Sequence, residues 1–171
     1  MIRTKTLFFL SFALFFVSAT AWSQVDINAK VKKTMEALKS KATKLGDAKL
    51  EGEETIAGKK VPGLILGSTK MTKNFGIVDE IKVEHGGTAT LFVKSGSEYV
   101  RVSTNVQKDD GSRAIGTILD PSGKAIVEIN KGAAFYGVVD ILGKPYTTGY
   151  EPLKDAKGEV IGIYYVGYLK D

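Results

Sequence analysis

Apolar residues recur every three or four positions from residue 26 to residue 45, at Ile27, Val31, Met35, Leu38, Ala42 and Leu45. This spacing is typical of one face of an α-helix. Asp26 is expected to cap the start of the helix and Gly46 to end it. The pattern therefore predicts a long N-terminal helix over residues 26–45, with a solvated face formed by Lys32, Lys33, Lys39 and Lys41.

Beyond this helix the hydrophobic period changes to two, which is typical of β-strands. Residues 47–76 are interrupted by glycines and Pro62, and they predict an ordered connection with short extended pieces. The predicted strands cover residues 77–84, 88–94, 98–105, 133–142, 146–153 and 160–169. Short turns join most of them, so the sheet is expected to be antiparallel. The predicted fold class is α+β, with the long helix packed on a central sheet of five to six strands.

The segment around Asp120-Pro121-Ser122-Gly123 fits two local structures. Its turn residues favour a β-hairpin. The apolar positions of residues 125–129 also fit a short helix that ends at Gly132. Local pattern alone leaves both interpretations open.

The first residues have the composition of a secretory signal peptide. Arg3 and Lys5 precede an apolar run over residues 7–17, and Ala21 and Ser23 are the small residues typical of a cleavage site. We therefore expect a leader over residues 1–23 and a single mature domain over 24–171 that is periplasmic or secreted. The alternative is an uncleaved anchor, although the apolar run is shorter than the roughly 20 residues of a membrane-spanning helix.

Charge and cysteine content exclude several classes of site. Loss of Arg3 and Lys5 with the leader lowers the formal net charge from +5 to +3. This mild charge is not the clustered basic pattern of nucleic-acid-binding proteins, so no nucleic acid partner is expected. The chain has no cysteine, which excludes disulfides, zinc–thiolate sites and cysteine nucleophiles.

The sequence carries no catalytic motif. His85 is the only histidine, and it stands beside a Gly-Gly turn, where a capping or surface role is typical. No nucleophile elbow, metalloprotease helix, P-loop or dinucleotide fingerprint is present. Asp109 and Asp110 are adjacent, so their side chains point apart and do not favour paired acid–base work. We therefore expect no enzyme activity, no cofactor and no metal site.

One predicted strand carries polar side chains where a core would be apolar. Alternation over residues 98–105 places Tyr99, Arg101, Ser103 and Asn105 on one face. An arginine in mid-strand suits a pocket, because its planar fork of donors matches a carboxylate. Arg113, in a loop-like stretch, is a second candidate ligand contact. The alternative for both arginines is solvent exposure or pairing with an acidic residue.

Tyrosines form a second candidate group. Tyr146 and Tyr150 are expected to share a strand face, and Tyr136 lies on the preceding strand. A tyrosine offers an apolar ring and one hydrogen-bonding tip, which suits a small amphiphilic ligand. The alternative is core packing with a satisfied hydroxyl, which is the expected role of Tyr164, Tyr165 and Tyr168.

Residues 89–167 resemble the single-Cache (sCache) sensor domains of bacterial chemoreceptors and histidine kinases. The similar pieces are ATLFVKSGSEYVRVSTNV (89–106), DGSRAIGT (110–117), NKGAAFYGVVDILGKPYTTGYEPLKD (130–155) and GEVIGIYYVG (158–167). The resemblance implies a PAS-like sheet with a small-molecule pocket, and it favours a helix over residues 122–131. It also implies a small carboxylate or amino acid as ligand. Because relatives often pair through this element, the helix of residues 26–45 is a candidate homodimer seam; the alternative is that its single apolar stripe packs entirely against the sheet.

The predicted last strand ends at Leu169 and the chain at Asp171, whereas a receptor Cache domain lies between two membrane spans. We therefore expect a sensor-type module that presents its bound state to a membrane partner, such as a receptor or a histidine kinase. Two alternatives remain open. One is a membrane-anchored co-receptor, and the other is an envelope interaction protein that has kept the fold without a ligand.

Overall fold

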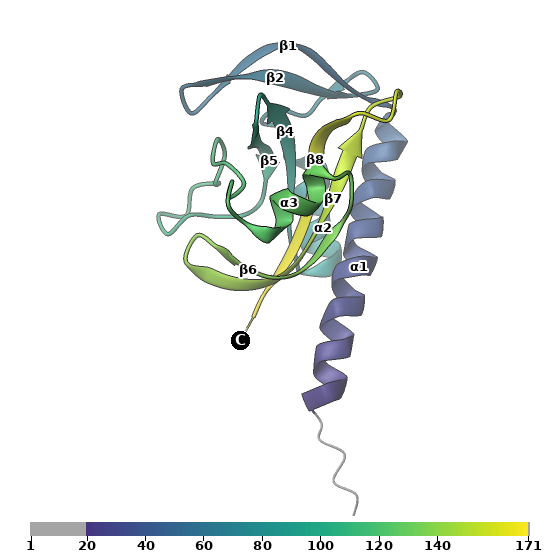
Figure 1. Ribbon diagram of the computed structural model, residues 1–171, viewed down its shortest axis with the longest axis vertical. Helices are drawn as coiled ribbons and strands as arrows, with labels where there is room; N and C mark the ends of the chain where they lie inside the picture. Colours follow the sequence, from purple (N-terminus) through teal and green to yellow (C-terminus); the bar gives the residue numbers. More distant parts are fainter. Residues whose placement is uncertain (1–19, 171) are drawn as a thin grey trace, which may run out of the picture.

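The computed structural model describes residues 20–170, with side chains from Ile27 onward. The elements are α1 (Thr20–Leu45), β1 (Ala48–Ile56), β2 (Lys59–Leu66), β3 (Thr69–Lys70), α2 (Gly76–His85), β4 (Thr88–Ser95), β5 (Glu98–Thr104), α3 (Lys124–Asn130), β6 (Phe135–Ile141), β7 (Lys144–Lys154) and β8 (Val160–Leu169). They form an antiparallel sheet in the order β1-β2-β3 and another in the order β5-β4-β8-β7-β6 (Figure 1). The predicted α+β class and the central antiparallel sheet are confirmed.

Helix α1 begins at Thr20, six residues earlier than predicted, and runs through Asp26 without a break. Asp26 is therefore not the cap, because no glycine or proline interrupts residues 20–26 and the helix continues upstream. Most of the predicted leader, residues 1–19, lies outside the described residues. The apolar stripe packs against β7 and β8, so these side chains are already buried within one copy of the chain: Val31, Met35, Leu38 and Ala42.

Residues 47–76 form more than the predicted connection. They contain a β-hairpin, β1–β2, and the two-residue strand β3. The hairpin turns at Ala57 and Gly58, whose φ angles of 47° and 80° suit the two-residue turn that matches strand twist. Glycines that indicated irregular structure are thus turn residues, while the apolar side chains Val61, Leu64 and Leu66 join the main core.

The predicted strand 77–84 is wrong, because this segment forms helix α2. The prediction assumed a hydrophobic period of two, yet the buried residues of this segment are Ile77, Val78 and Ile81, at helical spacing. Val83 is exposed. Gly86 ends the helix in the left-handed conformation, with its N–H bonded to the Lys82 carbonyl.

Helices cover the two faces of the five-stranded sheet unequally. Helices α1 and α2 close one face with a continuous apolar cluster. The other face is covered by the short α3 and the loop before it, with a separate apolar cluster beneath them (Figure 1). The helix expected over 122–131 is confirmed as α3, and Gly132 follows it with a φ of 75°.

An irregularity in β5 changes which side chains share a face. Leu91 pairs with Ser103 and Phe92 pairs with Arg101, so Val102 has no partner in β4. An extra residue of this kind is a β-bulge, and it breaks the alternation of side chains. Arg101 consequently points to the α3 side of the sheet, while Ser103 points to the α1–α2 side.

The outer edge of β5 pairs with a short irregular segment, residues 116–119. The Arg101 N–H donates to the Thr117 carbonyl at 2.9 Å, and the Gly116 N–H donates to the Arg101 carbonyl at 2.9 Å. Leu119 bonds to Tyr99 in the same way, at 2.9 Å. This pairing fixes the loop before α3 directly beside Arg101.

Candidate functional site

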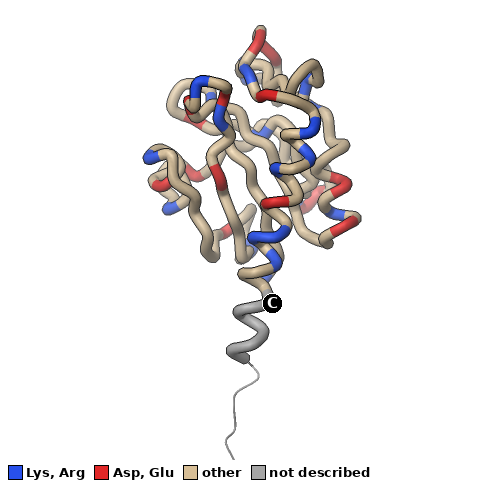
Figure 2. Tube along the Cα trace, turned by 90° about the vertical axis from the view of Figure 1, so that its right-hand side faces the viewer, with Lys and Arg blue, Asp and Glu red and all other residues tan. Residues whose placement is uncertain are grey.

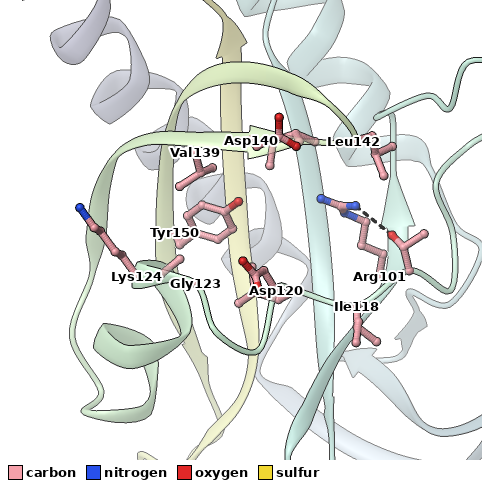
Figure 3. A pocket seen from close by; sticks show the side chains of 13 residues that line it. Arg101, Ile118, Asp120, Gly123, Lys124, Val139, Asp140, Leu142 and Tyr150 are labelled. Atoms are coloured by element: carbon pink, nitrogen blue, oxygen red, sulfur yellow. Dashed lines mark hydrogen bonds between the residues drawn. The ribbon is translucent and has the colours of Figure 1, made fainter.

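A cavity of about 250 Å³ lies between the α3 side of the sheet and the loop that leads into α3. Strand β5 supplies its floor, β6 and β7 supply one wall, and residues 117–125 supply the other (Figure 3). The lining residues are Arg101, Thr117, Ile118, Leu119, Asp120, Gly123, Lys124, Ala125, Val139, Asp140, Ile141, Leu142 and Tyr150.

Arg101 is the most unusual residue of this cavity. It is only 4% exposed, and burial lowers the pKa of its guanidinium. One amino group, Nη1, donates to the Thr117 hydroxyl at 2.8 Å, while the buried Nε has no hydrogen-bond partner. Across the described residues, no carboxylate forms a salt bridge with it. An arginine keeps its charge in proteins, so this is a buried cation with one neutral partner.

Aromatic rings support the guanidinium from the sheet. Its central carbon lies 5.1 Å from the centroid of the Phe92 ring and 6.0 Å from that of Tyr165. These contacts are cation–π interactions, which stabilise a desolvated cation by about 2 kcal/mol. They hold the guanidinium in place without occupying the N–H groups at its edge.

Tyr150 projects into the same cavity from β7. Figure 3 shows its hydroxyl and the Arg101 guanidinium directed towards each other. Burial raises the pKa of Tyr150, and burial raises the pKa of its neighbour Tyr165 to about 12. Both phenols are therefore protonated donors at neutral pH. In the described part of the chain, no residue forms a hydrogen bond with the Tyr150 hydroxyl.

Two carboxylates stand at the rim of the cavity. Asp120 accepts hydrogen bonds from the Ser122 N–H and hydroxyl at 2.9 and 2.8 Å, and these bonds lower its pKa. Asp140 accepts the Gly143 N–H at 2.8 Å. In both cases a single oxygen, Oδ1, receives these bonds. Lys124 also lines the cavity, but its amino group points outward in Figure 3.

The remaining predicted site residues do not line this cavity. Tyr99 lies in the same apolar cluster, and its hydroxyl is 3.3 Å from the Asn130 side-chain oxygen. Tyr146 packs against that cluster as a half-buried residue. Ser103 is on the other side of the sheet, where its hydroxyl donates to the Asn74 carbonyl at 2.5 Å.

Arg113 and Tyr136 are also placed away from the cavity. Arg113 forms a two-pronged salt bridge with Asp79 of α2, with both N–O distances at 2.8 Å. Tyr136 is on the α1 side of the sheet, where its hydroxyl donates to Glu151 at 2.5 Å. The structure therefore brings together two of the predicted ligand contacts, Arg101 and Tyr150.

Four polar lining residues were not predicted from the sequence: Thr117, Asp120, Lys124 and Asp140. Thr117 belongs to an irregular segment whose pairing with β5 has no periodic signal. Asp120 has the sequence signature of a turn, and it does form that turn through Ser122. The other oxygen of this carboxylate, Oδ2, accepts no bond within the turn. That the residue lines a cavity follows only from the position of the loop over the sheet.

Other features of the described residues have fewer of the properties of a binding site than the Arg101 cavity. A second, more open hollow of about 370 Å³ between α3 and β6 is lined by Lys124, Val127, Glu128 and Phe135, and none of these is a buried unpaired polar residue. Residues 20–170 contain no group of three or more His, Asp or Glu side chains able to hold a metal ion. Basic and acidic residues are interspersed along the trace in Figure 2, without a continuous basic stretch.

Within the described residues, no helix is long and apolar enough to cross a membrane. A comparison with curated proteins found no similar sequence. The family model described as the Cache 3/Cache 2 fusion domain matches residues 17–171. Cache domains are extracytoplasmic sensor modules, which generally bind small ligands and signal to partner kinases or receptors rather than catalyse reactions. The chain belongs to this Cache family.

Proposed function

We propose that this Cache domain binds a small organic anion, either a carboxylate or an amino acid, in the cavity beside Arg101. The observation that carries the proposal is a buried guanidinium, directed into a cavity, that has no carboxylate partner among residues 20–170. A buried charge without an ionic partner costs several kcal/mol of folding free energy. A ligand carboxylate would offset that cost each time it binds.

The size and the free donors of the cavity support a small ligand. A cavity of about 150 Å³ in another protein admits benzene, so about 250 Å³ suits an organic acid of a few carbons. Thr117 accepts a hydrogen bond from Nη1 of Arg101, while no residue of the described chain accepts one from Nη2, so the guanidinium keeps donors for a ligand carboxylate. The Tyr150 hydroxyl supplies a third donor from the opposite wall.

The position of the cavity also suggests how another protein detects that the ligand is bound. Ligand contacts would join β5 to the loop of residues 117–125 and to the β6–β7 turn. The loop and the turn lie at the surface, where an ordered conformation is accessible to a partner. In this proposal the leader of residues 1–23 exports the domain, and a membrane receptor or histidine kinase reads the bound state.

The first experiment is a thermal-shift screen of the purified domain against small carboxylates and amino acids. A ligand at about 100 times its Kd adds roughly 2.7 kcal/mol of stability, which raises Tm by several degrees for a domain of this size. We expect at least one compound to do so, and the response to disappear in Arg101→Ala.

The matched control is Lys94→Ala, which removes an exposed cation from the neighbouring strand β4 outside the cavity. This variant should keep the full response. If no compound shifts Tm, or if Arg101→Ala responds like the wild type, the proposal is wrong. The first of these results would favour an envelope interaction protein that keeps the fold without a ligand.

A further inference from the structure

We infer that two copies of this chain form a dimer by pairing their β6 strands, antiparallel and with Val138 at the two-fold axis, so that one sheet continues across both copies. Strand β6 is the last strand of the five-stranded sheet. The pairing uses a different surface from helix α1, whose apolar stripe is already buried against β7 and β8.

The other sheet edges of the described chain are covered, short or protected. Residues 116–119 bond to the outer edge of β5, and β3 is only two residues long. Strand β1 has a free edge, but it carries Lys49, Glu51 and Glu53 together with a shift in register. Charged side chains and bulges of this kind prevent a free edge from pairing with another chain.

Strand β6 has none of these protections over most of its length. Residues 135–139 contain no charge and no proline, and their register with β7 is continuous. Apart from its bonds to β7, the backbone of β6 forms no hydrogen bond with another segment of residues 20–170. A strand paired on one side presents a row of unpaired N–H and C=O groups on the other, which is a template for a further strand. Figure 1 shows β6 at the outer margin of the sheet.

Exposed apolar side chains gather along this edge. Seven large apolar residues are exposed in the described chain, and four of them flank β6: Val127, Tyr136, Val138 and Leu142. Val138, at the centre of the strand, is 47% exposed. On the opposite face, Val127 and Phe135 line the open hollow between α3 and β6. Single exposed apolar residues are ordinary, whereas a gathered patch indicates an interaction surface.

The sequence of β6 is complementary to itself in one antiparallel register. Residues directly opposite each other in neighbouring strands project to the same face of the sheet. With Val138 opposite Val138 of the second copy, Phe135 lies opposite Ile141 of the second copy, and Tyr136 lies opposite Asp140 of the second copy. Apolar side chains thus meet apolar side chains on one face, and the only charge of the strand meets a tyrosine on the other.

The charges beside this tyrosine favour a second copy as the partner. Lys32 of α1 lies over the Tyr136 ring, with Nζ 5.8 Å from the ring centroid, and it forms no salt bridge with a described carboxylate. Asp140 accepts the Gly143 N–H through Oδ1, which leaves Oδ2 available. In the paired register, Asp140 of the second copy comes beside Tyr136 and within reach of Lys32. The two-fold axis repeats this ion pair.

The same charges select the register. A shift by two residues would place Asp140 opposite Val138 or Ala134 of the second copy, and both ion pairs would be lost. An unrelated strand could satisfy the backbone of β6, but its sequence need not supply a carboxylate opposite Tyr136. The second copy supplies it on both sides of the axis.

A cysteine at the axis tests the geometry, because the chain has no cysteine of its own. Opposite Cα atoms in antiparallel strands are about 4.5–5.5 Å apart, which a disulfide can span. We expect mild oxidation of Val138→Cys to convert the purified domain to a covalent dimer. Val83→Cys is the matched control, since Val83 is a more exposed valine on α2. Equal cross-linking of the two variants would show random collision and overturn the inference.

Sedimentation equilibrium measures the dimer Kd without a cross-link. Val138→Lys places two like charges opposite each other at the axis, and we expect it to raise the dimer Kd about 100-fold. Its Tm at low concentration should match that of the wild-type monomer, because the side chain is exposed. Val83→Lys should leave the dimer Kd unchanged. A wild type that is monomeric up to its solubility limit, or a Val138→Lys variant that dimerises as tightly as the wild type, would overturn the inference.

Charge reversal tests the register. Lys32→Glu should raise the dimer Kd severalfold, because it sets a carboxylate beside Asp140 of the second copy. Combining Lys32→Glu with Asp140→Lys should restore much of the lost affinity. A double variant that dimerises more weakly than Lys32→Glu alone contradicts pairing about Val138. All of these measurements are made without ligand, so they give the same answer whether or not the Arg101 cavity binds one.

Discussion

The two arginines of the described residues differ both in burial and in the partners that bind them. Arg113 is about one-third exposed, yet it holds Asp79 with two bonds of 2.8 Å, donates to the Thr104 carbonyl and stacks 4.2 Å above the Phe75 ring. Arg101 is almost fully buried and has a single neutral partner. The more exposed arginine, Arg113, is thus paired with a carboxylate, whereas the buried Arg101 has none among the described residues.

This contrast separates a structural arginine from a binding arginine. Arg113 connects the loop of residues 107–116 to α2, and its partners belong to the chain itself. The surroundings of Arg101 hold it in place with aromatic rings and leave donors free. A folded state that keeps a buried cation unpaired gives up stability, and a ligand is the simplest group that restores it.

The contrast can be removed by giving Arg101 a carboxylate of its own. Thr117→Asp would place one where the Thr117 hydroxyl now accepts the Arg101 Nη1 bond. We expect the ligand affinity to fall by about 100-fold, or roughly 2.7 kcal/mol, because the new side chain competes for the guanidinium. Calorimetric titration measures this change. Thr117→Val, which removes the hydroxyl without adding charge, should lose much less.

Arg113, the arginine paired with Asp79, provides the second test. Arg113→Met removes the salt bridge to Asp79 and the bond to Thr104, and we expect a loss of about 2 kcal/mol in the free energy of unfolding. Ligand affinity should not change, since Arg113 lies outside the cavity. Urea denaturation and titration of the same sample distinguish the effects. Weaker binding with unchanged stability would contradict the assignment of Arg113 as structural.

The buried phenols beside Arg101 should make the free energy of unfolding fall at alkaline pH, and they should not change it near neutral pH. The pKa of Tyr165 is raised to about 12 and that of Tyr150 is also raised, whereas an unfolded tyrosine ionises near pH 10. The unfolded chain therefore releases these protons first, so the contribution of the two phenols to stability is constant below about pH 9 and is lost between about pH 10 and 12.

Tyr165→Phe should make this alkaline decline less steep, because one raised pKa is removed. Urea denaturation at a series of pH values measures the slope. An identical slope in Tyr165→Phe and wild type would show that Tyr165 is not shielded from solvent as described.

The sequence predicted the elements that have a strong periodic signal. The helix stripe and the strands of the central sheet were predicted from residue spacing. Residues 77–84 were predicted incorrectly, because they were assigned to the period-two pattern although the three buried positions have helical spacing. The β1–β2 hairpin was missed because its glycines read as loop residues rather than as turns.

The site was only partly predictable for a physical reason. Arg101 was identified because a charged residue in mid-strand is unusual, and Tyr150 because a row of tyrosines on one strand face suits a small amphiphilic ligand. Ser103 was misplaced by the bulge at Val102, which no local pattern signals. Asp120 lines the cavity from the loop before α3 and Asp140 from the end of β6, and only the folded arrangement brings these segments next to Arg101.

The most direct measurement compares the unfolding of wild type and Arg101→Met by urea, after refolding from denaturant has removed any bound small molecule. Methionine fills similar space without charge, so we expect the ligand-free variant to be more stable than wild type by about 1–2 kcal/mol. Adding the ligand found by thermal shift should stabilise wild type alone. A ligand-free variant that is clearly less stable than wild type would show that Arg101 maintains the fold, and would contradict its assignment as a binding residue.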